Sequence, residues 1–193
     1  SSTDGYRPQR IWWSALGDPR DFPDPLSDEA ANKSSGFIDI PGDHGAITGL
    51  VDGLGDAADV LVMFERAIYR ANYTGGRNVW DIQPAIAARG CIAPRSIVKI
   101  ANSVFYLGED GFYQFDGVNP KPIGNQRVDK TFFRDVDAGY YHNIIGALNI
   151  KNKTISWIYP GELADDGKPN RMLVYNWSLD EWSLIEIEVN HIF

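Results

Sequence analysis

Four aspartates in one loop are the group in this chain most suggestive of a metal site. They lie three to four positions apart and are interrupted by prolines. A calcium-binding EF-hand loop instead carries acidic residues at every second position around a central glycine. A solvated surface loop over residues 18–36 is therefore the favoured interpretation of Asp18, Asp21, Asp24 and Asp28.

The other residues with catalytic potential match no known constellation. The stretch from Gly42 to Gly45 lacks the lysine that a phosphate-binding loop needs after its last glycine. His44, His142 and His191 are too far apart in the sequence to form a local zinc-binding pair. No G-x-S-x-G elbow of a serine hydrolase occurs. We predict no enzyme, no catalytic or metal-binding residue and no cofactor, although a glycosidase-like pair of carboxylates stays open.

The single cysteine, Cys91, rules out an intrachain disulfide. A lone cysteine with a distant histidine can be a nucleophile. A small buried hydrophobe is the more frequent role of such a residue, and we predict that role here.

Tryptophans offer a second kind of site, because indole rings stack on sugars as readily as they fill cores and subunit interfaces. Both interpretations stay open. The candidate interface or sugar-stacking residues are Trp12, Trp13, Trp177 and Trp182, with Trp80 and Trp157 completing the set of six.

Composition limits the partners. The chain has 193 residues, 44% of them hydrophobic and 12% aromatic, which predicts a folded protein. Its net charge of −8 argues against tight, nonspecific nucleic-acid binding, although an acidic surface could line a passage through which DNA slides. No apolar run approaches the roughly 20 residues that span a membrane. No signal peptide is visible, and both ends look cut from a longer chain.

An internal repeat carries the fold prediction. Residues 60–70 align without a gap on residues 104–114, and both copies read as an apolar strand, a tight turn that begins with Glu and an aromatic strand. A period of about 45 residues is typical of propeller blades. Apolar residues over 56–72 also fit helical spacing, but Gly108 and Gly111 disfavour a helix in the second copy.

The repeat extends to three four-stranded units. We expect strands at 46–51, 59–64, 67–73 and 79–83, at 95–101, 103–107, 112–116 and 121–124, and at 143–150, 153–159, 171–176 and 182–189. The predicted fold is all-β, a propeller-like array of antiparallel blades forming an incomplete ring of about three and a half blades. It is one domain over 1–193, a fragment of a longer chain, with a partial blade at 10–40 and blades at 46–83, 95–124 and 143–189.

Strand patterns predict how each blade is buried. The second strands, 60–64 and 104–107, are apolar on both faces, as expected between two neighbouring sheets. The last strand alternates, with Ile185, Ile187 and Val189 on one face and glutamates on the other, which is typical of an outer strand with one wet face. Gly108, Asp110, Gly111 and Gly117 are predicted to form the structural turns between strands.

These stretches together resemble the propeller-bearing tail nozzle and packaged-DNA stabilisation proteins of tailed bacteriophages. The resemblance covers about residues 10–185 and rests on turn-and-strand signatures, namely Arg10–Pro19, Gly45–Leu50, Gly90–Ile97 and Phe105–Tyr113.

The resemblance implies a structural virion protein of a bacteriophage tail or head-to-tail junction. Such proteins form rings of identical copies below the portal and adaptor, extend the DNA channel, and help to retain packaged DNA and deliver it in genome ejection. The implied partners are other copies of the chain, portal, adaptor or other tail proteins, and DNA passing without sequence-specific contacts. The implied location is the virion tail, assembled in the host cytoplasm. The alternative function is a carbohydrate-binding, receptor-recognition propeller module.

Overall fold

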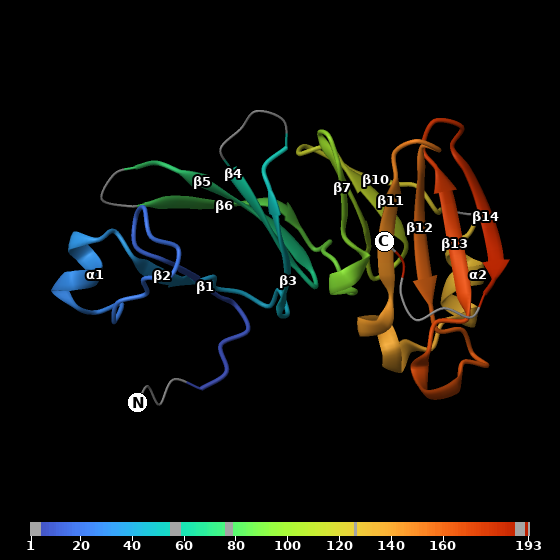
Figure 1. Ribbon diagram of the computed structural model, residues 1–193, viewed down its shortest axis with the longest axis horizontal. Coiled ribbons are helices and arrows are strands. Elements are labelled where there is room, and N and C mark those ends of the chain that lie inside the picture. Colours follow the sequence, from blue (N-terminus) through green and yellow to red (C-terminus); the bar gives the residue numbers. More distant parts are fainter. Residues whose placement is uncertain (1–4, 55–58, 76–78, 126, 188–191, 193) are drawn as a thin grey trace.

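The fold consists of antiparallel sheets stacked in series (Figure 1). The computed structural model describes residues 5–54, 59–75, 79–125, 127–187 and 192. Within them lie a two-stranded ribbon and three four-stranded sheets, and these residues form no closed ring. The ribbon pairs β1 (Arg10–Trp13) with β2 (Gly36–Asp39).

Each four-stranded sheet is a simple meander in which strands adjacent in sequence are paired. Sheet I contains β3 (Ile47–Asp52), β4 (Asp59–Phe64), β5 (Ala67–Tyr73) and β6 (Trp80–Ala87). Sheet II contains β7 (Val98–Ile100), β8 (Ser103–Leu107), β9 (Phe112–Phe115) and β10 (Pro120–Pro122). Sheet III contains β11 (Ile145–Asn149), β12 (Thr154–Tyr159), β13 (Arg171–Asn176) and β14 (Glu181–Glu186).

The predicted strands are thus confirmed, with small shifts at their ends. The helical alternative over 56–72 is wrong for the described residues, because β4 and β5 occupy them as a hairpin. Strand β6 runs further than predicted because a register shift opposite Pro84 lets this residue sit in an edge strand. Strands β7 and β11 start later than predicted, because the 3-10 segments η1 (Pro94–Ser96) and η2 (Ala138–Asn143) precede them.

Short helices lie in the connections and were missed by the sequence analysis. Helix α1 (Asp28–Asn32) interrupts the predicted loop at 18–36, where the Ser27 hydroxyl accepts a hydrogen bond from the Ala30 N–H and caps the helix. Helix α2 (Asp129–Asp135) lies between sheets II and III, and the 3-10 turn η3 (Asp165–Gly167) lies between β12 and β13. Strand periodicity gave no signal for such short segments.

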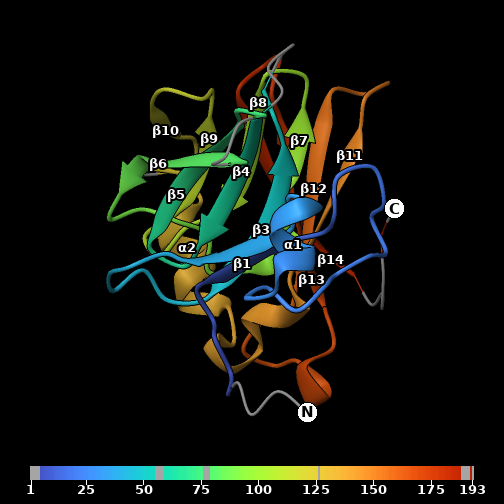
Figure 2. The same cartoon turned by 90° about the vertical axis from the view of Figure 1, so that its left-hand side faces the viewer.

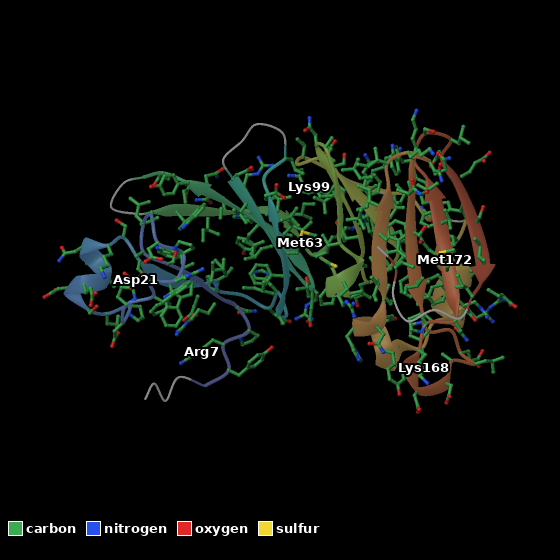
Figure 3. All side chains as sticks on the ribbon, viewed as in Figure 1. Arg7, Asp21, Met63, Lys99, Lys168 and Met172 are labelled. Carbon is green, nitrogen blue, oxygen red and sulfur yellow. The ribbon has the colours of Figure 1, made fainter. Side chains whose placement is uncertain are left out.

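Three apolar clusters hold the stack together, one at each interface. The first packs the ribbon on sheet I and contains Phe64, the second lies between sheets I and II and contains Met63, and the third lies between sheets II and III and contains Trp157. Figure 3 labels Met63 among the side chains between sheets I and II. Because alternate residues of β4 enter different clusters, this strand is apolar on both faces, as predicted.

The outer strand of sheet III differs from the prediction. Ile185 is 41% exposed, whereas Trp182 on the opposite face of β14 packs against the cluster between sheets II and III. The prediction that the Ile185 face is the packed one is therefore wrong. The Trp182 face of β14 is the packed one because Tyr175, its partner on β13, belongs to the buried cluster between sheets II and III. Val189 lies outside the described residues.

Candidate functional site

The two turns of the internal repeat lie side by side in space. Glu65 and Arg66, which join β4 to β5, line a cavity of about 370 Å³ together with Gly108, Glu109 and Asp110 of the β8–β9 turn. The cavity walls carry both positive and negative side chains. The repeat therefore places the β4–β5 turn of sheet I and the equivalent β8–β9 turn of sheet II next to each other, along the same edge of the two stacked sheets.

The predicted turn residues shape the β8–β9 hairpin. The Gly108 N–H donates to the Gly111 carbonyl at 2.8 Å, and the Tyr113 hydroxyl donates to Asp110 Oδ1 at 2.7 Å. A Cβ at Gly111 would collide with the Asp129 carboxylate, so this position requires glycine. Asp129, which the sequence analysis missed, accepts a hydrogen bond from the Phe112 N–H at 3.1 Å. Burial raises the pKa of Asp129.

Polar contacts bridge sheets I and II at their ends. Gly117 has a φ of +96°, and its carbonyl accepts a hydrogen bond from Arg70 Nη2 at 2.8 Å. Arg70 also pairs with the buried Asp59, with Nε 3.0 Å from Oδ2. Lys99 (labelled in Figure 3) reaches from β7 to Asp52 Oδ2 of β3 at 2.7 Å. Gly117 is thus both a turn residue, as predicted, and a partner across the interface.

Tryptophans close the interface between sheets II and III. The Trp157 indole N–H donates across it to the Ser96 carbonyl at 2.8 Å, and the Trp182 N–H donates to the Ile123 carbonyl at 3.0 Å. The two rings stack with centroids 5.7 Å apart, and Trp177 packs against the same cluster. Trp177 and Trp182 therefore lie at an interface between two sheets of the chain, where both are partly buried. Trp182 also lines a cavity of about 490 Å³, whereas Trp157 is fully buried.

Aromatic residues also line an open groove between the ribbon and sheet I. Two adjoining cavities, of about 680 and 340 Å³, share a wall made by Trp13, Ser34, Val79 and Trp80. Tyr73 lies in the smaller cavity, where its ring meets Trp80 edge to face at 5.5 Å. Trp12 does not line either cavity. It is 47% exposed and contacts Phe22.

Within the described part of the chain, the reactive side chains named in the sequence analysis each contact a neighbouring residue and do not gather in one site. The Cys91 thiol is buried and donates to the Ala93 carbonyl at 3.1 Å, and burial raises its pKa to about 11, so its predicted role as a small buried residue is confirmed. His44 Nε2 lies 3.0 Å from the Tyr69 hydroxyl. Among the loop aspartates, Asp21 pairs with Lys33 (Asp21 is labelled in Figure 3). The described residues contain no cluster of potential metal ligands. His191 lies outside them.

Two sequence comparisons place the chain in no known protein family. No family model matches the chain, and no curated protein matches its sequence. In the part of the chain that the structure describes, no helix is both long and apolar enough to cross a membrane.

Proposed function

We propose that this chain is a structural virion protein of a bacteriophage tail or head-to-tail junction, built as a propeller-like array around a DNA channel. One observation carries the proposal: three sheets of identical strand order stack face to face through apolar clusters. Serial stacking of meandering sheets is the construction principle of a propeller blade array. The resemblance of the sequence to tail nozzle proteins supplies the virion role.

The first strands of the sheets are the proposed lining of the axis. Strand β7 and its preceding turn η1 contact β11. A Cβ at Gly146 of β11 would lie 2.6 Å from Val98 of β7, so glycine is needed for this approach. The charged residues of β3, β7 and β11 are Asp52 and Lys99, which pair with each other. A neutralised lining would let DNA pass without strong phosphate contacts, since such contacts rest on unpaired basic side chains.

The outward face of sheet III is the proposed surface for the next sheet of the ring, contributed by another copy of the chain. It presents Met172, Val174 and Ile185, and Met172 and Ile185 are paired in the register (Met172 is labelled in Figure 3). Ile185 is 41% exposed. Apolar side chains gathered on one sheet face favour burial against a partner.

Substitution of this face tests the proposal. Ile185→Lys should weaken self-association roughly tenfold or more, because an unpaired buried charge costs more than about 1.4 kcal/mol. Leu184→Lys is the matched control, since Leu184 is 49% exposed on the opposite face of the same strand. Light scattering coupled to size-exclusion chromatography measures the mass, and negative-stain electron microscopy shows whether the particles are rings. A monomer at every concentration, or a monomer with hydrolytic activity, would contradict the proposal.

A further inference from the structure

The groove between the ribbon and sheet I has the features of a ligand site. The elements that line it, β1, β2, α1 and β6, lie at one end of the stack (Figures 1 and 2). Its aromatic walls come from two separate sheets. Trp13 belongs to β1, whereas Trp80 and Tyr73 are cross-strand partners on β6 and β5. The groove therefore presents indole rings from both sides.

Contacts within the ribbon fix the Trp13 ring in place. Its N–H donates to the Ser34 carbonyl at 3.0 Å, and the Ser35 hydroxyl donates to the Trp13 carbonyl at 2.9 Å. The ring lies over Gly36, where a Cβ would approach it to 2.9 Å. A wall that is rigid before binding lowers the entropic cost of holding a ligand.

The wall formed by β5 and β6 carries polar groups that are available to a ligand. Tyr73 is 44% exposed. Neither its hydroxyl nor the Trp80 indole N–H has a hydrogen-bond partner among the described residues. Asp18, Asp81 and several serines are among the lining residues, and the described lining includes no lysine or arginine.

We propose that this groove binds a neutral carbohydrate chain. Apolar faces of sugar rings pack on indole and phenol rings, and sugar hydroxyls donate to carboxylates and accept from groups such as the Trp80 N–H. The volumes of the two cavities fall within the range of small-molecule sites. This inference does not depend on the virion role proposed above.

Charge selects this ligand class over the main competitors. Anionic ligands, including nucleic acids and phosphates, would meet a lining with two acidic residues and, among the described residues, no cation. A cationic ligand such as a quaternary ammonium prefers a cage of ring faces around one point. Here Tyr73 and Trp80 meet edge to face, and the lining continues along both cavities, which suits an elongated chain of sugar rings.

Binding to three defined oligosaccharides tests the inference: cellohexaose, chitohexaose and maltohexaose, with choline as the cationic probe. Saturation-transfer NMR and tryptophan fluorescence titration should show binding of at least one hexasaccharide with a dissociation constant below about 1 mM. Trp80→Ala should weaken that binding roughly tenfold or more. Trp12→Ala is the matched control and should leave it unchanged, because Trp12 lies outside the groove.

A second pair of variants guards against a folding defect in Trp80→Ala. Tyr73→Ala and Asp81→Asn change exposed side chains, and each should weaken binding several-fold while the circular dichroism spectrum stays native. Failure of all three hexasaccharides to bind would overturn the inference. Binding that Trp12→Ala reduces as much as Trp80→Ala, or displacement of the sugar by choline at lower concentration than the sugar itself, would overturn it as well.

Discussion

Two interfaces of this stack contain the same aromatic residue types, but one buries its rings and the other leaves them lining an open groove. Between sheets II and III the rings of Phe112, Trp157 and Trp182 pack into one cluster that closes completely over Phe112 and Trp157, whereas Trp182 at its rim lines a cavity of about 490 Å³. Between the ribbon and sheet I, Trp13 and Trp80 line an open groove. The comparison shows that aromatic composition does not determine whether an interface closes.

The two interfaces differ in whether a connecting segment fills the space between the neighbouring sheets. Helix α2 places Phe132 against Phe112, with ring centroids 5.0 Å apart, and so fills the space beside sheet III. The connection from β2 to β3 is short and contributes no such element. The hydrogen bonds of the indole N–H groups differ in the same way. Trp157 donates across the interface between sheets II and III, whereas Trp13 donates to the Ser34 carbonyl in the connection between β1 and β2.

The largest expected effect is the loss of Trp157. Trp157→Ala should lower the free energy of unfolding by about 3–5 kcal/mol, because it leaves a cavity in a closed core and removes the hydrogen bond to Ser96. Urea unfolding followed by far-ultraviolet circular dichroism measures the change. Trp13→Ala is the counterpart at the open interface and should cost only about 1–2 kcal/mol. Equal costs would show that the two interfaces are not energetically distinct.

The sequence predicted the strands well because their signals are local. The unbroken apolar runs over 60–64 and 104–107 and the turn residues Gly108 and Gly111 are signals that act within a few residues. The same reasoning assigned the wrong packed face to Ile185. Which face of an edge strand is covered depends on the neighbouring sheet, and here Trp182 across the strand decided it.

The candidate site was less predictable than the fold. The sequence named Trp12 and Trp13 together, but alternation places them on opposite faces of β1, and only Trp13 reaches the groove. Trp80 and Tyr73 come together through the β5–β6 register, which residue type alone does not reveal. Asp129 gave no signal either, since its role depends on Gly111, a distant residue in the chain.

A smaller, local effect would sharpen the comparison at the groove. Helix α1 supports the groove wall through Ala31, and the Ser27 cap holds its first turn. Ser27→Ala should cost about 1 kcal/mol locally and speed hydrogen exchange at the Ala30 amide roughly fivefold. The urea midpoint should not move, because the first turn of α1 is largely exposed and can open while the ribbon strands stay packed on sheet I. Ser178→Ala, an exposed serine of the β13–β14 turn, is the control. A shifted global midpoint would mean that the first turn of α1 opens only together with the sheets.

The subtlest expected effect is on the pH dependence of stability, because the interface between sheets II and III contains the buried carboxylate of Asp129. Burial, with a contribution from nearby Asp110, raises the pKa of Asp129 in the folded protein. The folded state therefore binds its proton more tightly than the unfolded state does, and this contribution to stability is lost as pH rises from about 4 through the raised pKa.

Asp129→Asn tests this sign. Asparagine stays neutral and can still accept the Phe112 N–H, so the variant should gain stability relative to the parent as pH rises from about 4 to 7. Urea midpoints across that range measure the difference. A difference that stays constant over this range would mean that folding does not raise the pKa of Asp129, and its burial would then carry no electrostatic cost.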